Sequence, residues 1–283
     1  MARSFRLSAP LALSLLIAGC TVSAERFPTS GDYPPTTMQR YAFQAGGHPW
    51  TLSALRTPRD APWKVVIVTG TPSWSEYWAP TLAALPKDYT MVVADRPGFA
   101  QSQPDGVVGS IADQADALSP LLEAAPGQKV ILVGQSYGAP IAALMAQRHP
   151  GKVQALVLVS PFFGERGETA QRLTGLGGLV RPMLPRDLKN SIAEVRGQAA
   201  QLPAARAALK GLTVPVLVVH GDADDFVPVA SARTIARDGG PAGRTQLVEV
   251  PGGDHFLNAC CVPALLSAFE KAAALASSPP QPR

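Results

Sequence analysis

Apolar residues in this chain of 283 residues come in short unbroken runs, and polar or glycine-rich stretches separate the runs. The runs contain few polar positions, so they lack the alternation of a strand with one face in water. In parallel sheets, strands that are covered on both faces show this pattern. Such strands are predicted at residues 65–69, 89–94, 130–133, 153–159, 214–220 and 245–250. Helices are predicted between and after them, at residues 75–85, 110–124, 137–149, 230–236 and 263–275.

The alternation of strands and helices predicts one α/β domain, residues 39–276, built on a mostly parallel, doubly wound sheet. A hairpin with arms at residues 41–45 and 50–55 precedes the alternating units. The interval 161–212 contains no predicted strand and is patterned for short helices. We expect a small helical cap here, inserted after the sixth strand, and an element that only packs on the surface is the alternative. The apolar residues of these helices are Leu173, Leu176, Leu179, Met183, Leu184 and Leu188.

The pentapeptide GQSYG at residues 134–138 lies between a predicted strand and a predicted helix. In this setting Gly-x-Ser-x-Gly is typical of a nucleophile elbow, a sharp turn that presents the serine at the carboxyl edge of the sheet. We expect Gly134 and Gly138 to be required because a Cβ at either position would collide with a neighbouring strand or helix. The positive end of the following helix favours negative charge near Ser136. A serine in an ordinary turn is the alternative.

A nucleophilic serine needs a base, and the base needs a group that orients it. His255 and Asp224 each follow a predicted strand, so both are expected at the carboxyl edge of the sheet, where parallel sheets place ligand sites. The remaining histidines lie in less suitable places, in the hairpin turn, at a helix end and at a strand end: His48, His149 and His220.

Three aspartates share the acidic loop, and Asp224 is preferred as the orienting acid, with Asp222 as the second choice and Asp225 beside them. The loop lacks the alternating oxygen ligands, turn glycine and distant glutamate of a calcium loop. The chain also lacks H-E-x-x-H and paired Cys-x-x-Cys sequences. We therefore expect neither a metal nor another cofactor.

With these features in this order, the chain resembles the α/β-hydrolase fold serine hydrolases over residues 40–276. The resemblance implies that Ser136 is the nucleophile and that His255 is the general base and acid. Asp224 occupies the acid position of the family sequence G-x-x-D-x-x-V-P, which begins at Gly221.

The resemblance extends to two loops. The segment TGTP occupies the place of the family's His-Gly loop, with Thr69 in place of the usual histidine. The family then implies that the backbone N–H groups of Thr71 and Tyr137 form the oxyanion hole. The segment DRPGFAQS resembles the family turn D-R-x-G-x-G-x-S, with Ala100 in place of a glycine, and Arg96 is expected to be a structural partner within that turn. The two departures bear on loop shape, because neither residue performs chemistry in the family.

The implied activity is acyl transfer, with hydrolysis of carboxylic esters that carry a small or medium acyl group. The same triad also supports hydrolysis of amides, lactones or C–C bonds, and perhydrolysis. A serine nucleophile argues against dehalogenase and epoxide-hydrolase chemistry, which use aspartate in this fold. A non-catalytic binding lipoprotein on the same scaffold is the alternative from another class. Aromatic residues near the predicted site either pack on the sheet or form the wall of an acyl pocket: Trp74, Tyr77, Trp78, Phe162 and Phe163.

Residues 1–19 combine two arginines, a short apolar run and small residues, which predicts a secretory signal peptide. The ending LIAGC resembles a bacterial lipobox, which implies a lipidated Cys20 bearing diacylglycerol and usually an N-linked acyl chain of the palmitate type. An ordinary signal peptide is the alternative. Thr21 is not the aspartate associated with inner-membrane retention, so we expect an anchor in the outer membrane, facing the periplasm. Residues 20–38 predict a tether, and residues 277–283 a disordered tail.

Cys260 and Cys261 are adjacent, so they form either a vicinal disulfide or two buried thiols, and we expect the thiols. Loss of Arg3 and Arg6 with the signal peptide lowers the 25 basic side chains by two, against 21 acidic ones, so the mature domain is near neutral. No basic run with interleaved aromatic residues is present, which argues against a nucleic-acid partner. The expected partners are a small ester or acyl substrate and the membrane, and the sequence leaves the oligomeric state open.

Overall fold

A computed structural model describes residues 28–172, 175 and 183–278 of the chain. The predicted signal peptide and Cys20 lie outside the described residues, as do Leu173, Leu176 and Leu179. In the part that is described, no helix has the length and apolar character needed to cross a membrane.

Eight strands form one sheet in the order β1-β2-β4-β3-β5-β6-β7-β8. The hairpin β1–β2 is antiparallel and joins β4 antiparallel, whereas every other neighbouring pair is parallel. The prediction of a mostly parallel, doubly wound sheet is therefore confirmed. The strands are β1 (Gln39–Gln44), β2 (Thr51–Arg56), β3 (Trp63–Val68), β4 (Tyr89–Ala94), β5 (Lys129–Gln135), β6 (Ala155–Val159), β7 (Val216–Gly221) and β8 (Thr245–Val250).

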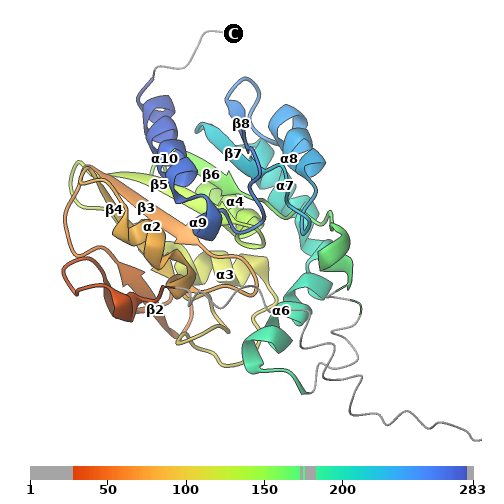
Figure 1. The fold of residues 1–283 in the computed structure, drawn as a ribbon, viewed down its shortest axis with the longest axis horizontal. Helices are drawn as coiled ribbons and strands as arrows, with labels where there is room; N and C mark the ends of the chain where they lie inside the picture. The colour runs from red at the N-terminus through yellow and green to blue at the C-terminus, as the bar shows by residue number, and fades with distance from the viewer. Residues whose placement is uncertain (1–27, 173–174, 176–182, 279–283) are drawn as a thin grey trace, which may run out of the picture.

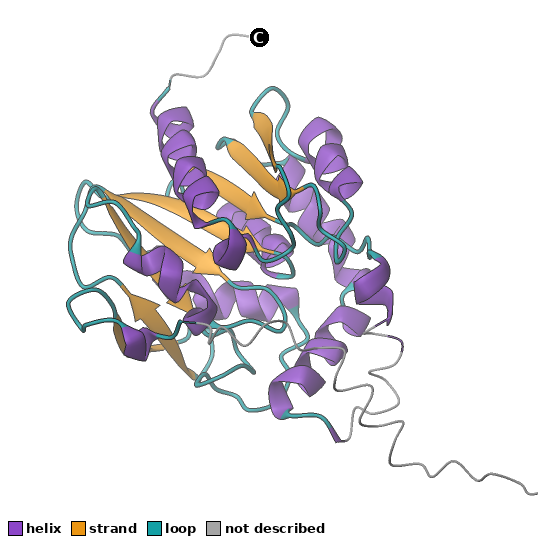
Figure 2. Cartoon of the chain, viewed as in Figure 1, coloured by secondary structure: helices purple, strands orange, loops and turns teal. Residues whose placement is uncertain are grey.

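Helices cover both faces of the sheet, as Figures 1 and 2 show. One apolar cluster joins the sheet to α3, α4 and α7, and a second joins its other face to α2, α9 and α10. This two-sided cover explains why the central strands carry unbroken apolar runs. The described helical elements are η1 (Ser30–Asp32), η2 (Ser75–Trp78), α2 (Ala79–Ala83), α3 (Ile111–Leu118), η3 (Ser119–Leu122), α4 (Gly138–Arg148), α6 (Arg186–Gly197), η5 (Ala199–Gln201), α7 (Leu202–Lys210), α8 (Val229–Thr234), η6 (Ile235–Gly239), α9 (Leu257–Cys260) and α10 (Val262–Ser277).

The interval expected to form a cap, residues 161–212, has two different parts. Helix α7 buries Leu202, Ala205 and Leu209 in the same apolar cluster as α4, so it is a core crossover helix of the domain. The predicted interval therefore extends too far toward its C-terminal end. Helix α6 lies apart from the helices that cover the two faces of the sheet (Figure 1).

Helix α6 buries a polar face. Its buried residues are Asn190, Ser191 and Glu194, whereas Leu188 is 40% exposed and Met183, just before the helix, is 87% exposed. The buried face is polar because α6 meets backbone carbonyls and a buried arginine, which require hydrogen-bonding partners.

Both ends of the domain reach into segments that were predicted to be irregular. The Ser30 N–H and hydroxyl donate to the Glu76 carboxylate at 2.6 and 2.8 Å, and Met38 is buried, so the described end of the predicted tether packs on the domain. Helix α10 includes Ser277, the first residue of the predicted tail. Residues 279–283 lie outside the described part.

Candidate active site

Ser136 lies in a strained turn between β5 and α4. Its φ is +48°, a left-handed conformation that non-glycine residues rarely adopt. A Cβ added to Gly134 would lie 2.7 Å from the Ala139 Cα, and one added to Gly138 would lie 2.3 Å from the Val68 carbonyl oxygen. The two glycines thus let the strand, the turn and the helix approach closely, as the sequence predicts.

Three side chains from separate loops converge at this turn. The Ser136 Oγ lies 3.0 Å from His255 Nε2, and His255 Nδ1 lies 2.8 Å from Asp224 Oδ2. All three residues are at least nine-tenths buried. An ionised carboxylate only accepts hydrogen bonds, so Nδ1 carries the imidazole proton and Nε2 is free to accept the serine hydroxyl proton. The sequence reasoning selected these three residues, and the structure places them in contact.

The Asp224 carboxylate is fixed by its own loop. Its Oδ1 accepts hydrogen bonds from the N–H groups of Phe226 and Val227, both at 2.9 Å. Burial raises the pKa of Asp224, but the hydrogen bond and charge of His255, with the Val227 N–H, outweigh burial and bring the pKa below its ordinary value. Asp224 is therefore ionised at neutral pH and can stabilise an imidazolium.

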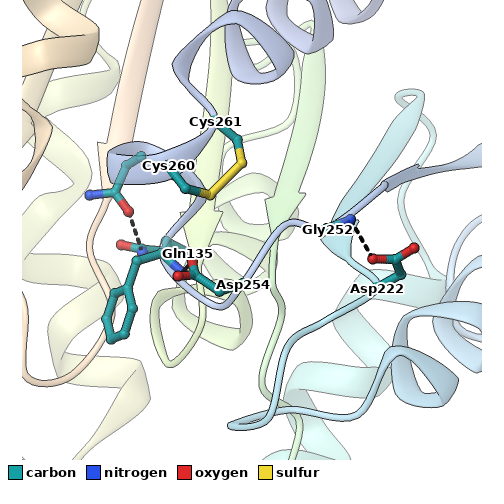
Figure 3. Close-up of a disulfide and its surroundings, with 8 residues drawn as sticks. Gln135, Asp222, Gly252, Asp254, Cys260 and Cys261 are labelled. Carbon is teal, nitrogen blue, oxygen red and sulfur yellow. Dashed lines mark hydrogen bonds between the residues drawn. A yellow bond between two sulfur atoms is a disulfide. The ribbon is translucent and has the colours of Figure 1, made fainter. Parts of the chain in front are cut away.

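The other two aspartates of the acidic loop have different partners. Asp222 Oδ1 accepts the Gly252 N–H at 2.7 Å, and Asp225 Oδ2 accepts the Thr169 hydroxyl at 2.7 Å. Asp222, the second choice for the orienting acid, instead fastens the loop that carries His255 (Figure 3).

The loop that carries His255 crosses directly over the end of β7. A Cβ added to Gly221 would lie 2.0 Å from the Gly253 carbonyl oxygen, so only glycine allows this crossing. The His255 ring stacks on Phe226, with ring centroids 5.1 Å apart, and meets the edge of Phe256 at 5.4 Å. These contacts set the plane of the imidazole.

The loop expected to supply oxyanion donors lies against the serine. A Cβ added to Gly70 would lie 2.9 Å from the Ser136 Cβ. Within the described residues, no backbone or side-chain acceptor bonds the N–H groups of Thr71 or Tyr137. The two departures from the family sequences keep the loop shapes: the Thr69 hydroxyl donates to the Ser73 carbonyl at 3.3 Å, and Ala100 adopts a φ of +45°, which suits the glycine it replaces.

Sequence reasoning set aside His220, which the structure places beside the acid. Its Nε2 donates to the Val227 carbonyl at 2.9 Å and lies 3.3 Å from Asp224 Oδ2. Burial lowers the pKa of His220 despite the nearby carboxylate, so this histidine is neutral at pH 7. The sequence signal for this contact is that His220 lies one residue before the end of β7 and four residues before Asp224, which places both side chains near the same strand end.

Gln135 and Asn258 were also missed. The Gln135 amide donates to the Asn258 side chain at 3.1 Å, and Asn258 donates to the Tyr77 carbonyl at 2.7 Å. Because Gln135 precedes the serine and Asn258 follows the histidine loop, this pair ties the two loops together. Figure 3 labels Gln135 and shows it near Cys260, at the end of α9.

The aromatic residues divide between two regions. Trp74 and Tyr77 line a cavity of about 490 Å³ that continues from Pro72, one residue beyond Thr71, to the start of α6. Trp78 is fully buried in the core. Phe162 and Phe163 are buried as well, and Phe163 lines a separate cavity beside α7. Of the residues predicted to form the pocket, Trp74 thus lies beside the oxyanion loop, and the two phenylalanines do not share its cavity.

Cys260 and Cys261 form a disulfide where α9 meets α10 (Figure 3). Cys260 is exposed and Cys261 is half-buried. The expectation of two buried thiols is wrong because α9 ends at the surface here, and the chain leaves neither side chain in the core.

Comparison with known proteins agrees with this architecture. A sequence model described as the alpha/beta hydrolase fold matches residues 64–175. A thermophilic esterase from Thermogutta terrifontis has a similar structure, with a TM-score of 0.67, 19% identity, and coverage of 85% of this chain and 100% of that chain. An esterase from Rhodococcus sp. ECU1013 is similar at a TM-score of 0.63 and 20% identity, covering 83% and 99% of the two chains.

A haloalkane dehalogenase variant from Bradyrhizobium elkanii is equally similar, with a TM-score of 0.66, 19% identity, and coverage of 84% of this chain and 97% of that chain. The chain therefore has the α/β-hydrolase fold. At these identities the likeness concerns the fold alone, and the chemistry has to be argued from the site.

Proposed function

We propose that this protein is a serine hydrolase that cleaves carboxylic esters through an acyl-enzyme. The observation that carries the proposal is the continuous hydrogen-bonded chain from Ser136 Oγ through His255 to Asp224. The serine at the start of this chain lies in a left-handed turn. A nucleophile, a base and an orienting acid in this geometry are the parts that acyl transfer needs.

In the first half of the reaction, Ser136 Oγ attacks the ester carbonyl carbon and its proton passes to His255 Nε2. Asp224 stabilises the imidazolium, and the N–H groups of Thr71 and Tyr137 bind the oxyanion. The C–O bond to the alcohol then breaks, and Nε2 returns the proton to the leaving oxygen. In the second half, water loses a proton to Nε2 and attacks the acyl group, which releases the acid and restores the Ser136 hydroxyl.

A fluorophosphonate probe tests the nucleophile directly. We expect covalent labelling of the wild type at Ser136 and no labelling of Ser136→Ala. The neighbouring Ser160 also has a left-handed φ of +45° but lies outside the triad, so Ser160→Ala is the matched control and should still be labelled. The proposal would be refuted if the folded wild-type protein neither reacted with the probe nor cleaved any p-nitrophenyl ester in a series of graded acyl-chain length.

The size of the cavity beside the oxyanion loop supports an ester substrate with a small or medium acyl group. Its walls include Trp74, Tyr77 and Leu188, and its volume of about 490 Å³ is that of a small-ligand site. We expect Trp74→Ala to shift the best p-nitrophenyl ester toward longer acyl chains, measured as kcat/KM across the series. An unchanged chain-length profile would show that the acyl group binds elsewhere.

We also propose that the mature protein is anchored in the outer membrane through a lipidated Cys20 and faces the periplasm. The LIAGC sequence supports this, and the Cys260–Cys261 disulfide is compatible with an oxidising compartment. Replacing Cys20 with alanine should move the protein from the membrane fraction to the soluble fraction or block its maturation. Mass spectrometry of the mature N-terminus would contradict the anchor if it found an unmodified cysteine.

A further inference from the structure

Arg96 is a fully buried arginine whose contacts reach far beyond its own turn. Its guanidinium binds both carboxylate oxygens of Glu194 in α6, at 2.7 and 3.0 Å. It also donates to Gln114 Oε1 at 2.5 Å and to the Gly70 carbonyl oxygen at 2.8 Å. Arg96 contacts Phe99 of its own turn, as expected, and in addition it joins a helix 98 residues away in sequence to the oxyanion loop.

The contact with Gly70 bears on the site because of peptide geometry. The Gly70 carbonyl and the Thr71 N–H belong to one planar amide group, so fixing the oxygen fixes the direction of the N–H. The N–H points away from the carbonyl, and no acceptor in the described chain holds it. A cation on the carbonyl oxygen also polarises the amide and strengthens its N–H as a donor.

Helix α6 contacts the same loop a second time. The Thr71 hydroxyl and the Ser191 hydroxyl are 2.9 Å apart. Ser191 and Glu194 are three residues apart on the helix and therefore share one face. One face of α6 thus holds both residues of the Gly70–Thr71 pair. Ser191 contacts Thr71 directly, and Glu194 holds Arg96, which binds the Gly70 carbonyl.

The Arg96 guanidinium has little freedom to move. It lies over the rings of Phe99 and Tyr137, with the guanidinium carbon 4.6 and 5.1 Å from the ring centroids. Tyr137 is the residue whose own N–H is the second oxyanion donor in the proposed function. Arg96 therefore contacts the Gly70–Thr71 peptide through the Gly70 carbonyl and the second donor residue through the Tyr137 ring.

We propose that Arg96, held by Glu194 of α6, is a positioning residue that orients the Gly70–Thr71 peptide as an oxyanion donor. The catalytic part of this inference rests on the proposed function. Stability alone is a poor reason for a buried ion pair, since apolar residues of similar volume usually serve as well or better. A purely structural pair and a positioning pair therefore predict different results when both charges are removed together.

The test uses the double variant Arg96→Met/Glu194→Leu, which leaves no unpaired charge, and in which Gln114 keeps its bond to the Val108 carbonyl. The matched control is Arg148→Met/Asp116→Leu, because Arg148 likewise binds one carboxylate and one backbone carbonyl, between α4 and α3.

One nuclear magnetic resonance signal reports on the peptide in question. Thr71 is the only threonine that follows a glycine in the sequence. Protein labelled with ¹³C at glycine carbonyls and ¹⁵N in threonine therefore gives a single HNCO cross-peak, from Gly70–Thr71. We expect this cross-peak to move in both heteronuclear dimensions in the double variant and to stay in place in the control. A cross-peak that does not move overturns the inference.

Kinetics test the catalytic consequence on an ester that the wild type cleaves. Full removal of an oxyanion donor costs about 10²–10³ in kcat, so a misdirected donor should cost about tenfold, with KM changed by less than about twofold. A moved cross-peak with wild-type kcat would refute the positioning role. A wild type that neither cleaves esters nor reacts with the fluorophosphonate would refute the proposed function, while the cross-peak would still test the hold on the peptide. If the double variant does not fold, Glu194→Gln, which keeps the side-chain shape, is measured by the same cross-peak and the same kinetics.

Discussion

Replacing Asp224 with asparagine tests the triad at its most constrained atom. The Oδ1 position faces two donors, the N–H groups of Phe226 and Val227, so the amide NH₂ cannot occupy it. The NH₂ must therefore take the Oδ2 position, 2.8 Å from His255 Nδ1, and donate to it. The imidazole then carries its proton on Nε2, which faces Ser136 Oγ at 3.0 Å and can no longer accept the hydroxyl proton.

A base held in the wrong tautomer costs about 10⁴ in kcat in serine triads, or about 5 kcal/mol of transition-state stabilisation. We expect that loss for Asp224→Asn, measured as kcat for a p-nitrophenyl ester at pH 7, with a thermal unfolding curve to show that the variant is folded. The fluorophosphonate labelling rate should fall in parallel, because it depends on the same proton transfer.

The neighbouring aspartates give matched controls. Asp222→Asn and Asp225→Asn remove one charge from the same loop, but their carboxylates bind Gly252 and Thr169, not the imidazole. Both variants should keep kcat within about threefold of the wild type because the His255 tautomer is unchanged. The role of Asp224 as the orienting acid is refuted if Asp224→Asn keeps more than about a tenth of wild-type kcat, or if Asp222→Asn loses as much as Asp224→Asn.

Three further outcomes follow from the structure. Gly138→Ala should lose about 3 kcal/mol or more in urea unfolding, because its Cβ would lie 2.3 Å from the Val68 carbonyl oxygen, and a loss below about 1 kcal/mol would contradict the close approach. Since burial lowers the pKa of His220 below 6.5, the unfolded state takes up a proton that the folded state resists, and stability should fall as pH drops below about 6.5. His220→Gln should flatten that slope in unfolding curves at pH 7 and 5, and an unaltered slope would assign the proton uptake to another group. Replacing Cys260 and Cys261 with serine should cost at most about 1 kcal/mol, because the bond closes a minimal loop in the unfolded chain, and a larger fall in unfolding free energy would show a packing role.

The sheet and the triad could be predicted because both are encoded locally. Each central strand is covered on both faces, so it appears in the sequence as an unbroken apolar run. Ser136, Asp224 and His255 each follow such a run, and parallel strands bring their carboxyl ends to one edge of the sheet. Strand ends and residue types were therefore sufficient to select the three residues.

The role of α6 could not be predicted in the same way. Local periodicity shows which helix face is apolar, but the buried face of α6 is polar, so the pattern pointed to Leu188 and away from Glu194. Glu194 is satisfied by Arg96, a residue 98 positions away in sequence. Helix α7 was assigned to the cap for a related reason, because glycine and proline break the interval before it and conceal where the core resumes. The state of Cys260 could not be decided because adjacency in sequence does not fix whether the chain turns outward.

Under the proposed function, the crossing of the histidine loop over Gly221 makes catalysis depend on a residue that has no side chain. Asp224 is held by its own backbone and Ser136 by its strained turn, whereas His255 rests on the bare end of β7. A single methyl group at position 221 would displace the Gly253 carbonyl, and with it the loop that places the imidazole, while Ser136 and the cavity beside Trp74 stay in place. Such a protein would hold an ester without consuming it, which makes this position a route to an inert form for co-crystallisation.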